Sequence, residues 1–165
     1  MPLTERRLPR SGIRLALPLV LVLVLVPVPA RAEEREVPYW ASLTANKVNM
    51  RVGPARHYRI DWVFRRDGLP VKVVRLHEGW RLIEDPVGSR GWVLSRFLSR
   101  ARAALVTGRI AELREQPGAG GRVLWRLERG VVGLLGECAD GWCKLDVHGR
   151  KGWVDASSVW GDGEP

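Results

Sequence analysis

The chain has 165 residues and a formal net charge of +9, from 27 Lys and Arg against 18 Asp and Glu, with eight Trp and two Cys. A chain of this length holds one or two small domains. The sequence lacks the G-x-S-x-G, H-E-x-x-H and phosphate-loop motifs that many hydrolases, zinc peptidases and nucleotide-binding proteins carry. We therefore expect a protein that is not an enzyme and has neither cofactor nor metal.

The N-terminal segment predicts export. Leu15 to Val26 is a run of 12 apolar residues, followed by Ala30-Arg31-Ala32, which fits a signal-peptidase site. Four arginines precede the run: Arg6, Arg7, Arg10 and Arg14. The run is shorter than the roughly 20 residues that a membrane span needs. Residues 1–32 are therefore predicted to be a signal peptide cleaved after Ala32, which leaves no stable membrane span, and residues 33–39 a charged, mobile lead-in.

The rest of the chain carries one pattern twice. V-N-M-R-V-G-P begins at Val48 and is followed by a strand with Trp62, then Gly79-Trp80 and Gly91-Trp92. A-E-L-R-E-Q-P begins at Ala111 and is followed by the corresponding Trp125, Gly141-Trp142 and Gly152-Trp153, at offsets of 63, 62 and 61 residues along the chain. The repeat indicates two copies of one small module, residues 40–100 and 103–161, with a linker at about residues 99–103.

Each copy consists of short β-rich stretches separated by turn signals such as Gly53-Pro54 and Asp140-Gly141. No window outside the N-terminal segment has helical periodicity, so the fold class is predicted to be all-β, with two small barrels. Four Trp in apolar strands are expected in the cores: Trp62, Trp92, Trp125 and Trp153. The predicted strands are residues 60–64, 69–76, 80–83 and 91–94 in the first copy and 123–127, 131–135, 142–145 and 152–155 in the second.

The order V-N-M-R-x-G-P, then R-x-G-L-P-V-x-V, G-W-R-L-I and G-W-V-x-x-x-x-L resembles the bacterial SH3-like (SH3b) domain family. More narrowly, it resembles tandem SH3-like periplasmic proteins of Gram-negative bacteria. The resemblance covers about residues 40–161 and implies SH3-like barrels and a periplasmic location. Cell-wall binding is common in that family. The resemblance therefore implies a partner in the cell envelope, either peptidoglycan or an envelope protein.

The two cysteines flank a predicted hairpin turn at Asp140-Gly141, a pair favoured in two-residue type I′ loops. That turn places Cys138 opposite Cys143, within reach of a disulfide. An exported protein is expected to oxidise such a pair. A metal site with His148, a redox pair and two free buried thiols remain as alternatives.

The first copy is the better candidate for binding. Residues 33–100 contain 13 basic and 8 acidic residues, whereas residues 101–165 contain 9 of each. A basic exported module favours an anionic envelope component over nucleic acid, although an Arg-rich solvated surface is an equally good interpretation. The expected ligand-binding residues are Arg51, His57, Tyr58 and Trp80, with packing in the core or a turn as the alternative for Trp80. The alternative function is a periplasmic scaffold or accessory subunit of an envelope enzyme.

Overall fold

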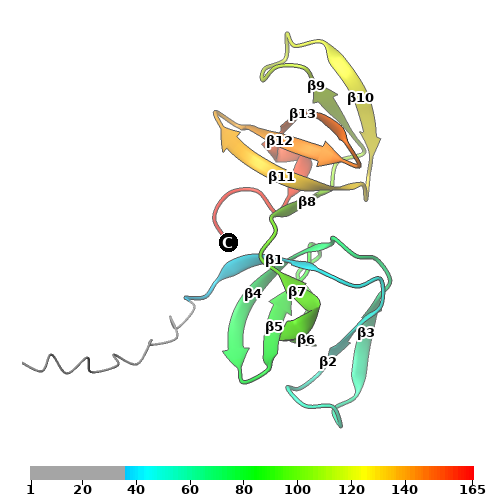
Figure 1. The fold of residues 1–165 in the computed structure, drawn as a ribbon, viewed down its shortest axis with the longest axis vertical. Helices are drawn as coiled ribbons and strands as arrows, with labels where there is room; N and C mark the ends of the chain where they lie inside the picture. Colours follow the sequence, from blue (N-terminus) through cyan, green and yellow to red (C-terminus); the bar gives the residue numbers. More distant parts are fainter. Residues whose placement is uncertain (1–35) are drawn as a thin grey trace, which may run out of the picture. The chain divides into compact units, whose positions relative to one another are not determined.

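The computed structural model describes residues 36–165, which form only strands, turns and two short 3₁₀ helices (Figure 1). The predicted all-β class is confirmed. The predicted signal peptide, its cleavage site and residues 33–35 lie outside the described residues. Within residues 36–165, none of the helices has the length and apolar character needed to cross a membrane.

The fourteen strands form two seven-stranded sheets with the same topology. The order is β3-β2-β6-β5-β4-β1-β7 in the first sheet and β10-β9-β13-β12-β11-β8-β14 in the second, so each strand corresponds to the one seven places later. The first sheet contains β1 (Tyr39–Leu43), β2 (Val48–Arg51), β3 (Ile60–Phe64), β4 (Pro70–His77), β5 (Trp80–Glu84), β6 (Arg90–Leu94), η1 (Ser95–Phe97) and β7 (Leu98–Ser99). The second contains β8 (Ala103–Val106), β9 (Ile110–Arg114), β10 (Val123–Glu128), β11 (Val132–Ala139), β12 (Trp142–Val147), β13 (Arg150–Asp155), η2 (Ala156–Ser158) and β14 (Val159–Trp160).

Each sheet encloses its own apolar core. Val48, Val71, Ile83 and Val93 are fully buried in the first. Leu113, Leu145 and Val154 are among the corresponding buried residues of the second. In each copy, the second Gly-Trp pair needs a glycine because a larger residue would collide with a neighbouring core side chain. A Cβ atom on Gly91 would lie 2.4 Å from Cγ of Met50, and one on Gly152 would lie 2.7 Å from Cγ of Leu113.

Two of the four tryptophans predicted to lie in the cores are exposed instead, and for these the prediction is wrong. The exposed fraction is 59% for Trp62 and 47% for Trp125, while Trp92 and Trp153 are half-buried. Trp62 lies on β3 and Trp125 on β10, the first strand in the order of each sheet. An edge strand has a neighbour on one side only, so its large side chains are covered less well than those of an inner strand.

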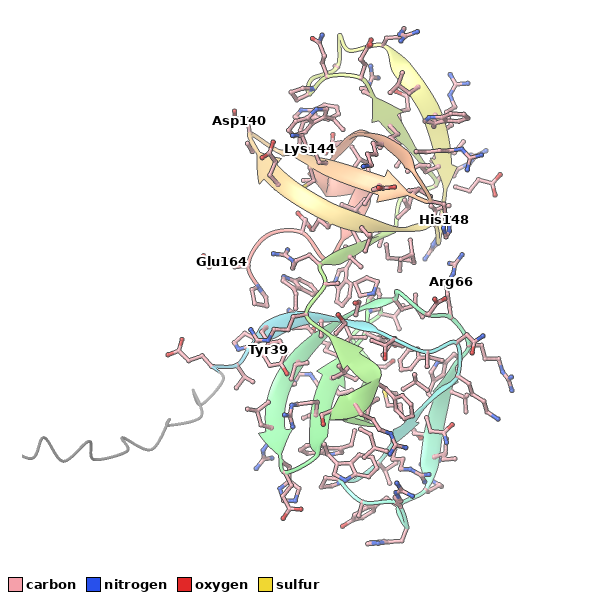
Figure 2. All side chains as sticks on the ribbon, viewed as in Figure 1. Tyr39, Arg66, Asp140, Lys144, His148 and Glu164 are labelled. Carbon is pink, nitrogen blue, oxygen red and sulfur yellow. A yellow bond between two sulfur atoms is a disulfide. The ribbon has the colours of Figure 1, made fainter. Side chains whose placement is uncertain are left out.

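The predicted disulfide is present. Cys138 at the end of β11 pairs with Cys143 on β12, and their sulfurs are bonded. Asp140 and Gly141 both have positive φ values, 51° and 77°, as a type I′ turn requires. Figure 2 shows Asp140 at the tip of this hairpin and Lys144 further along β12. The bond therefore closes the hairpin directly behind its turn.

Candidate functional site

A groove on the first sheet has an apolar base and a basic rim. Its volume is about 230 Å³. Trp80, at the start of β5, is its least exposed wall residue, at 8%. Trp80 pairs across the sheet with Leu94, and Phe97 follows in η1. We call this the first groove; its walls are Lys47, Asn49, Arg51, Arg56, Trp80, Leu94, Arg96 and Phe97.

Four of these walls are cationic, and none of the four pairs with a carboxylate among residues 36–165. Lys47, Arg56 and Arg96 are exposed, whereas Arg51 is half-buried. Arg96 packs its guanidinium against the Phe97 ring at 4.8 Å from the centroid. Like charges gathered in a concave site raise the local concentration of anions. The first groove is therefore suited to an anionic ligand.

Arg51 also fixes the loop that borders the groove. Its Nη1 donates a hydrogen bond of 2.6 Å to the carbonyl oxygen of Tyr58. The Tyr58 ring lies against the backbone of Gly53, where a Cβ atom would be 2.6 Å from the ring. His57 stacks on Tyr58 with 4.6 Å between ring centroids. These contacts order residues 53–58.

The second sheet has the equivalent groove with a different charge. Its walls are Ile110, Glu112, Arg114, Ala119, Arg126, Trp142, Asp155 and Ser158, and we call it the second groove. Asp155 pairs with Trp142 as Leu94 pairs with Trp80. Glu112 stands where the first copy has Asn49. The two cations of this groove thus face two carboxylates.

Both acids of the second groove have fixed partners. Glu112 forms an ion pair with Nη2 of Arg114 and lies 3.7 Å from Nε of Arg126. Asp155 accepts hydrogen bonds from the Oγ and backbone N–H of Ser157, at 2.7 and 2.9 Å. These bonds hold the pKa of Asp155 below its usual value, the hydroxyl contributing most. Asp155 is therefore ionised at neutral pH and cancels part of the positive charge around it.

The structure brings two of the four predicted binding residues together. Arg51 and Trp80 are walls of the first groove, whereas His57 and Tyr58 are exposed neighbours that are not among its walls. Sequence reasoning missed six wall residues: Lys47, Asn49, Arg56, Leu94, Arg96 and Phe97. The two copies differ at all six positions, but they differ at many other positions too, so the sequence alone carried no signal that singled out these residues. In the described chain, no group of three or more His, Cys, Asp and Glu could hold a metal ion.

Comparisons with known proteins found relatives by sequence and by structure. A Bacillus subtilis (strain 168) protein provisionally named N-acetylmuramoyl-L-alanine amidase YrvJ is 25% identical over 134 residues, which cover 74% of this chain and 26% of the relative. Among solved structures, NlpC1 from Trichomonas vaginalis has a TM-score of 0.33 at 15% identity, and the match covers 80% of this chain and 50% of the NlpC1 chain. An NlpC/P60 family protein from Bacillus cereus ATCC 10987 has a TM-score of 0.33 at 13% identity, and the match covers 73% of this chain and 55% of the Bacillus cereus chain.

The chain thus spans about a quarter of the curated relative and about half of each solved chain. The family model described as bacterial SH3 domain matches residues 44–100 and again residues 108–161, together more than half of the chain. Each matched segment contains all the walls of one groove and begins after the first strand of its sheet, β1 or β8. The chain belongs to the bacterial SH3 domain family.

Proposed function

We propose that this protein is an exported, non-catalytic binding module that recognises peptidoglycan in the cell envelope. The observation that carries the proposal is the first groove, where an apolar base and four cations without carboxylate partners form a concave site. A site with an apolar base and a few convergent polar groups is typical of ligand-binding pockets. Arg51 and Trp80 are proposed as ligand contacts, while His57 and Tyr58 support the bordering loop.

The relatives support the cell wall as the target. The curated relative carries the name of an amidase that acts on N-acetylmuramoyl-L-alanine, a wall component. This chain matches only a quarter of that protein, so the activity in its name does not transfer with the match. Family membership supports binding, and a fold by itself does not define a reaction. We therefore assign recognition and no hydrolysis.

The disulfide supports an exported location. Structural disulfides persist in oxidising compartments and are rare in the cytosol. Cys138 and Cys143 form such a bond on a two-residue hairpin. Together with the signal peptide expected over residues 1–32, it supports the periplasm as the site of action.

Retention of the full chain on purified sacculi tests the proposal, with low and physiological salt as two arms. We expect retention in both, weaker at physiological salt because the cationic groove is screened. A chain that stays in the supernatant at both salt concentrations would reject peptidoglycan as the target. Zymography on the same sacculi should show no clearing, and a cleared band would reject the non-catalytic assignment.

A scaffold or accessory-subunit function is supported by a different observation. Trp62 and Trp125 are both strongly exposed on edge strands, and aromatic residues are enriched at protein interfaces. Cross-linking in the periplasm separates the two functions. A scaffold should give one discrete protein adduct that disappears when both tryptophans are replaced, whereas a wall binder should give none.

A further inference from the structure

The two grooves occupy equivalent positions and differ in charge. Lys47, Arg56 and Arg96 of the first groove correspond by the repeat to Ile110, Ala119 and Ser157 of the second copy. Arg51 and Arg114 occupy the same repeat position, so each groove has one arginine there. The second groove also has two carboxylates, Glu112 and Asp155, at the positions where the first groove has Asn49 and Leu94. The common fold therefore supports one strongly cationic groove and one with balanced charge.

We infer that the first groove selects an acidic peptide with two or more carboxylates, and that the second groove does not bind it. This inference rests on the proposed function and names the ligand chemistry of the same site. Arginine guanidinium groups bind carboxylates with paired hydrogen bonds, and lysine adds a mobile point charge. Several cations without carboxylate partners around one small groove fit a ligand with more than one anionic group.

The uncharged walls favour a peptide over a phosphate polymer. Trp80, Leu94 and Phe97 provide apolar surface that can cover the methylene groups of an acidic side chain. The Asn49 side-chain amide has a hydrogen-bond donor and an acceptor, and these can pair with the C=O and N–H groups of a peptide bond. A phosphate polymer would be bound chiefly through its charges and would leave this apolar base unused.

The second groove is closed to the same ligand by its own carboxylates. Glu112 already contacts both cations, Arg114 and Arg126. Nη1 of Arg114 donates to two loop carbonyl oxygens, those of Ala119 and Gly121 at 2.7 and 2.6 Å, whereas Nη1 of Arg51 donates to one, that of Tyr58. Ionised Asp155 would repel an approaching carboxylate beside Trp142. One acidic peptide should therefore bind per chain.

The test uses the full chain and the tripeptide L-alanyl-γ-D-glutamyl-meso-diaminopimelate as the probe. Its analogue with all carboxylates amidated is the second probe, and linear polyphosphate is the third. Titration followed by the indole N–H signals of Trp80 and Trp142 reports the two grooves separately. The charge variant is the triple substitution Lys47→Gln, Arg56→Gln and Arg96→Gln, which leaves the loop contact of Arg51 intact. Arg126→Gln, in the second groove, is the control for loss of a single cation outside the first groove.

We expect the tripeptide to shift the Trp80 signal and not the Trp142 signal. The triple variant should lose about tenfold in affinity, since each of the three exposed charges contributes about twofold, while Arg126→Gln should bind like the wild type. The amidated probe should bind about tenfold more weakly than the tripeptide. Equal affinity for both peptides, an unaffected triple variant, a shift at Trp142, or tighter binding of polyphosphate at Trp80 would each overturn the inference.

Sacculus retention of the same variants separates this inference from the proposed function. Loss of retention in the triple variant supports both. If the triple variant is retained like the wild type, the groove inference fails and wall binding stands. If the tripeptide binds at Trp80 but no form of the protein is retained on sacculi, the proposed function fails and the groove chemistry stands.

Discussion

Nη1 of Arg51 donates a hydrogen bond of 2.6 Å to the carbonyl oxygen of Tyr58, and Arg114 makes the equivalent bond to Gly121, also at 2.6 Å. The first and second copies are alike in this bond even though their loops differ in sequence. The arginine thus belongs to the fold in both sheets, and in the first groove it is also a wall residue and a proposed ligand contact. We therefore expect binding and loop order to be coupled at this residue.

Replacing Arg51 should therefore reduce stability as well as binding. We expect Arg51→Gln to lower the free energy of unfolding by about 1 kcal/mol, because a charge-assisted hydrogen bond to the loop is lost. Lys47→Gln removes an exposed charge from the same groove and should change stability by about 0.5 kcal/mol or less. Denaturant unfolding measures both. Equal stability of the two variants would show that the Arg51 bond does not hold the loop.

The two kinds of tryptophan should respond oppositely to truncation. Trp80→Ala removes a buried indole and should cost about 3–5 kcal/mol, enough to unfold a small module. Trp62→Ala removes a side chain that is 59% exposed, and we expect a cost of about 1 kcal/mol or less. Thermal unfolding of both variants followed by circular dichroism checks this. A larger loss for Trp62→Ala would mean that β3 is covered by a contact outside the described structure.

The sequence was sufficient for the architecture because the repeated Gly-Trp pairs and turn residues act locally. The Asp140-Gly141 turn, for instance, sets the register that brings Cys138 opposite Cys143. Periodicity did not distinguish Trp62 from Trp92, because the pattern within a strand does not say whether that strand lies at an edge or inside the sheet. The groove depends on residues far apart in the chain, such as Lys47 and Arg96. Their meeting is a consequence of sheet order, which no local pattern encodes.

Reduction of the disulfide should weaken the second module selectively. The bond closes a loop of a few residues, for which chain entropy gives about 2 kcal/mol. In the first copy, Leu76 and Arg81 occupy the equivalent pair of positions, so that module has no bond to lose. We expect a reductant to lower the unfolding midpoint reported by Trp142 and Trp153 and to leave that of Trp80 unchanged. The double variant with Cys138→Ala and Cys143→Ala should be insensitive to reductant. If it still responds, the reductant acts elsewhere in the protein.

Asp155 should make the second module sensitive to acid. Its carboxylate caps η2 through Ser157, which depresses its pKa in the folded state. A depressed pKa adds stability that is present above the unfolded value of 3.8 and is lost as the pH falls through the lower, folded value. We expect wild type and Asp155→Ala to differ by about 1 kcal/mol at neutral pH and to converge below pH 3.8. Parallel stability curves down to acidic pH would contradict this account of the cap.

A single substitution should open the second groove to anions. Glu112→Asn installs the residue that the first copy has at this position and releases Arg114 and Arg126 from their shared carboxylate. Removing one of the two negative charges leaves two cations against Asp155 alone and should produce a second tripeptide site, weaker than the first groove and reported by a shift of the Trp142 indole signal. Glu115→Asn is the matched control. It changes the net charge by the same amount, but Glu115 pairs with exposed Arg122 and is not a wall of the groove. If both variants gain affinity alike, net charge rather than groove chemistry governs binding; if neither does, the carboxylate of Glu112 is not what excludes the ligand.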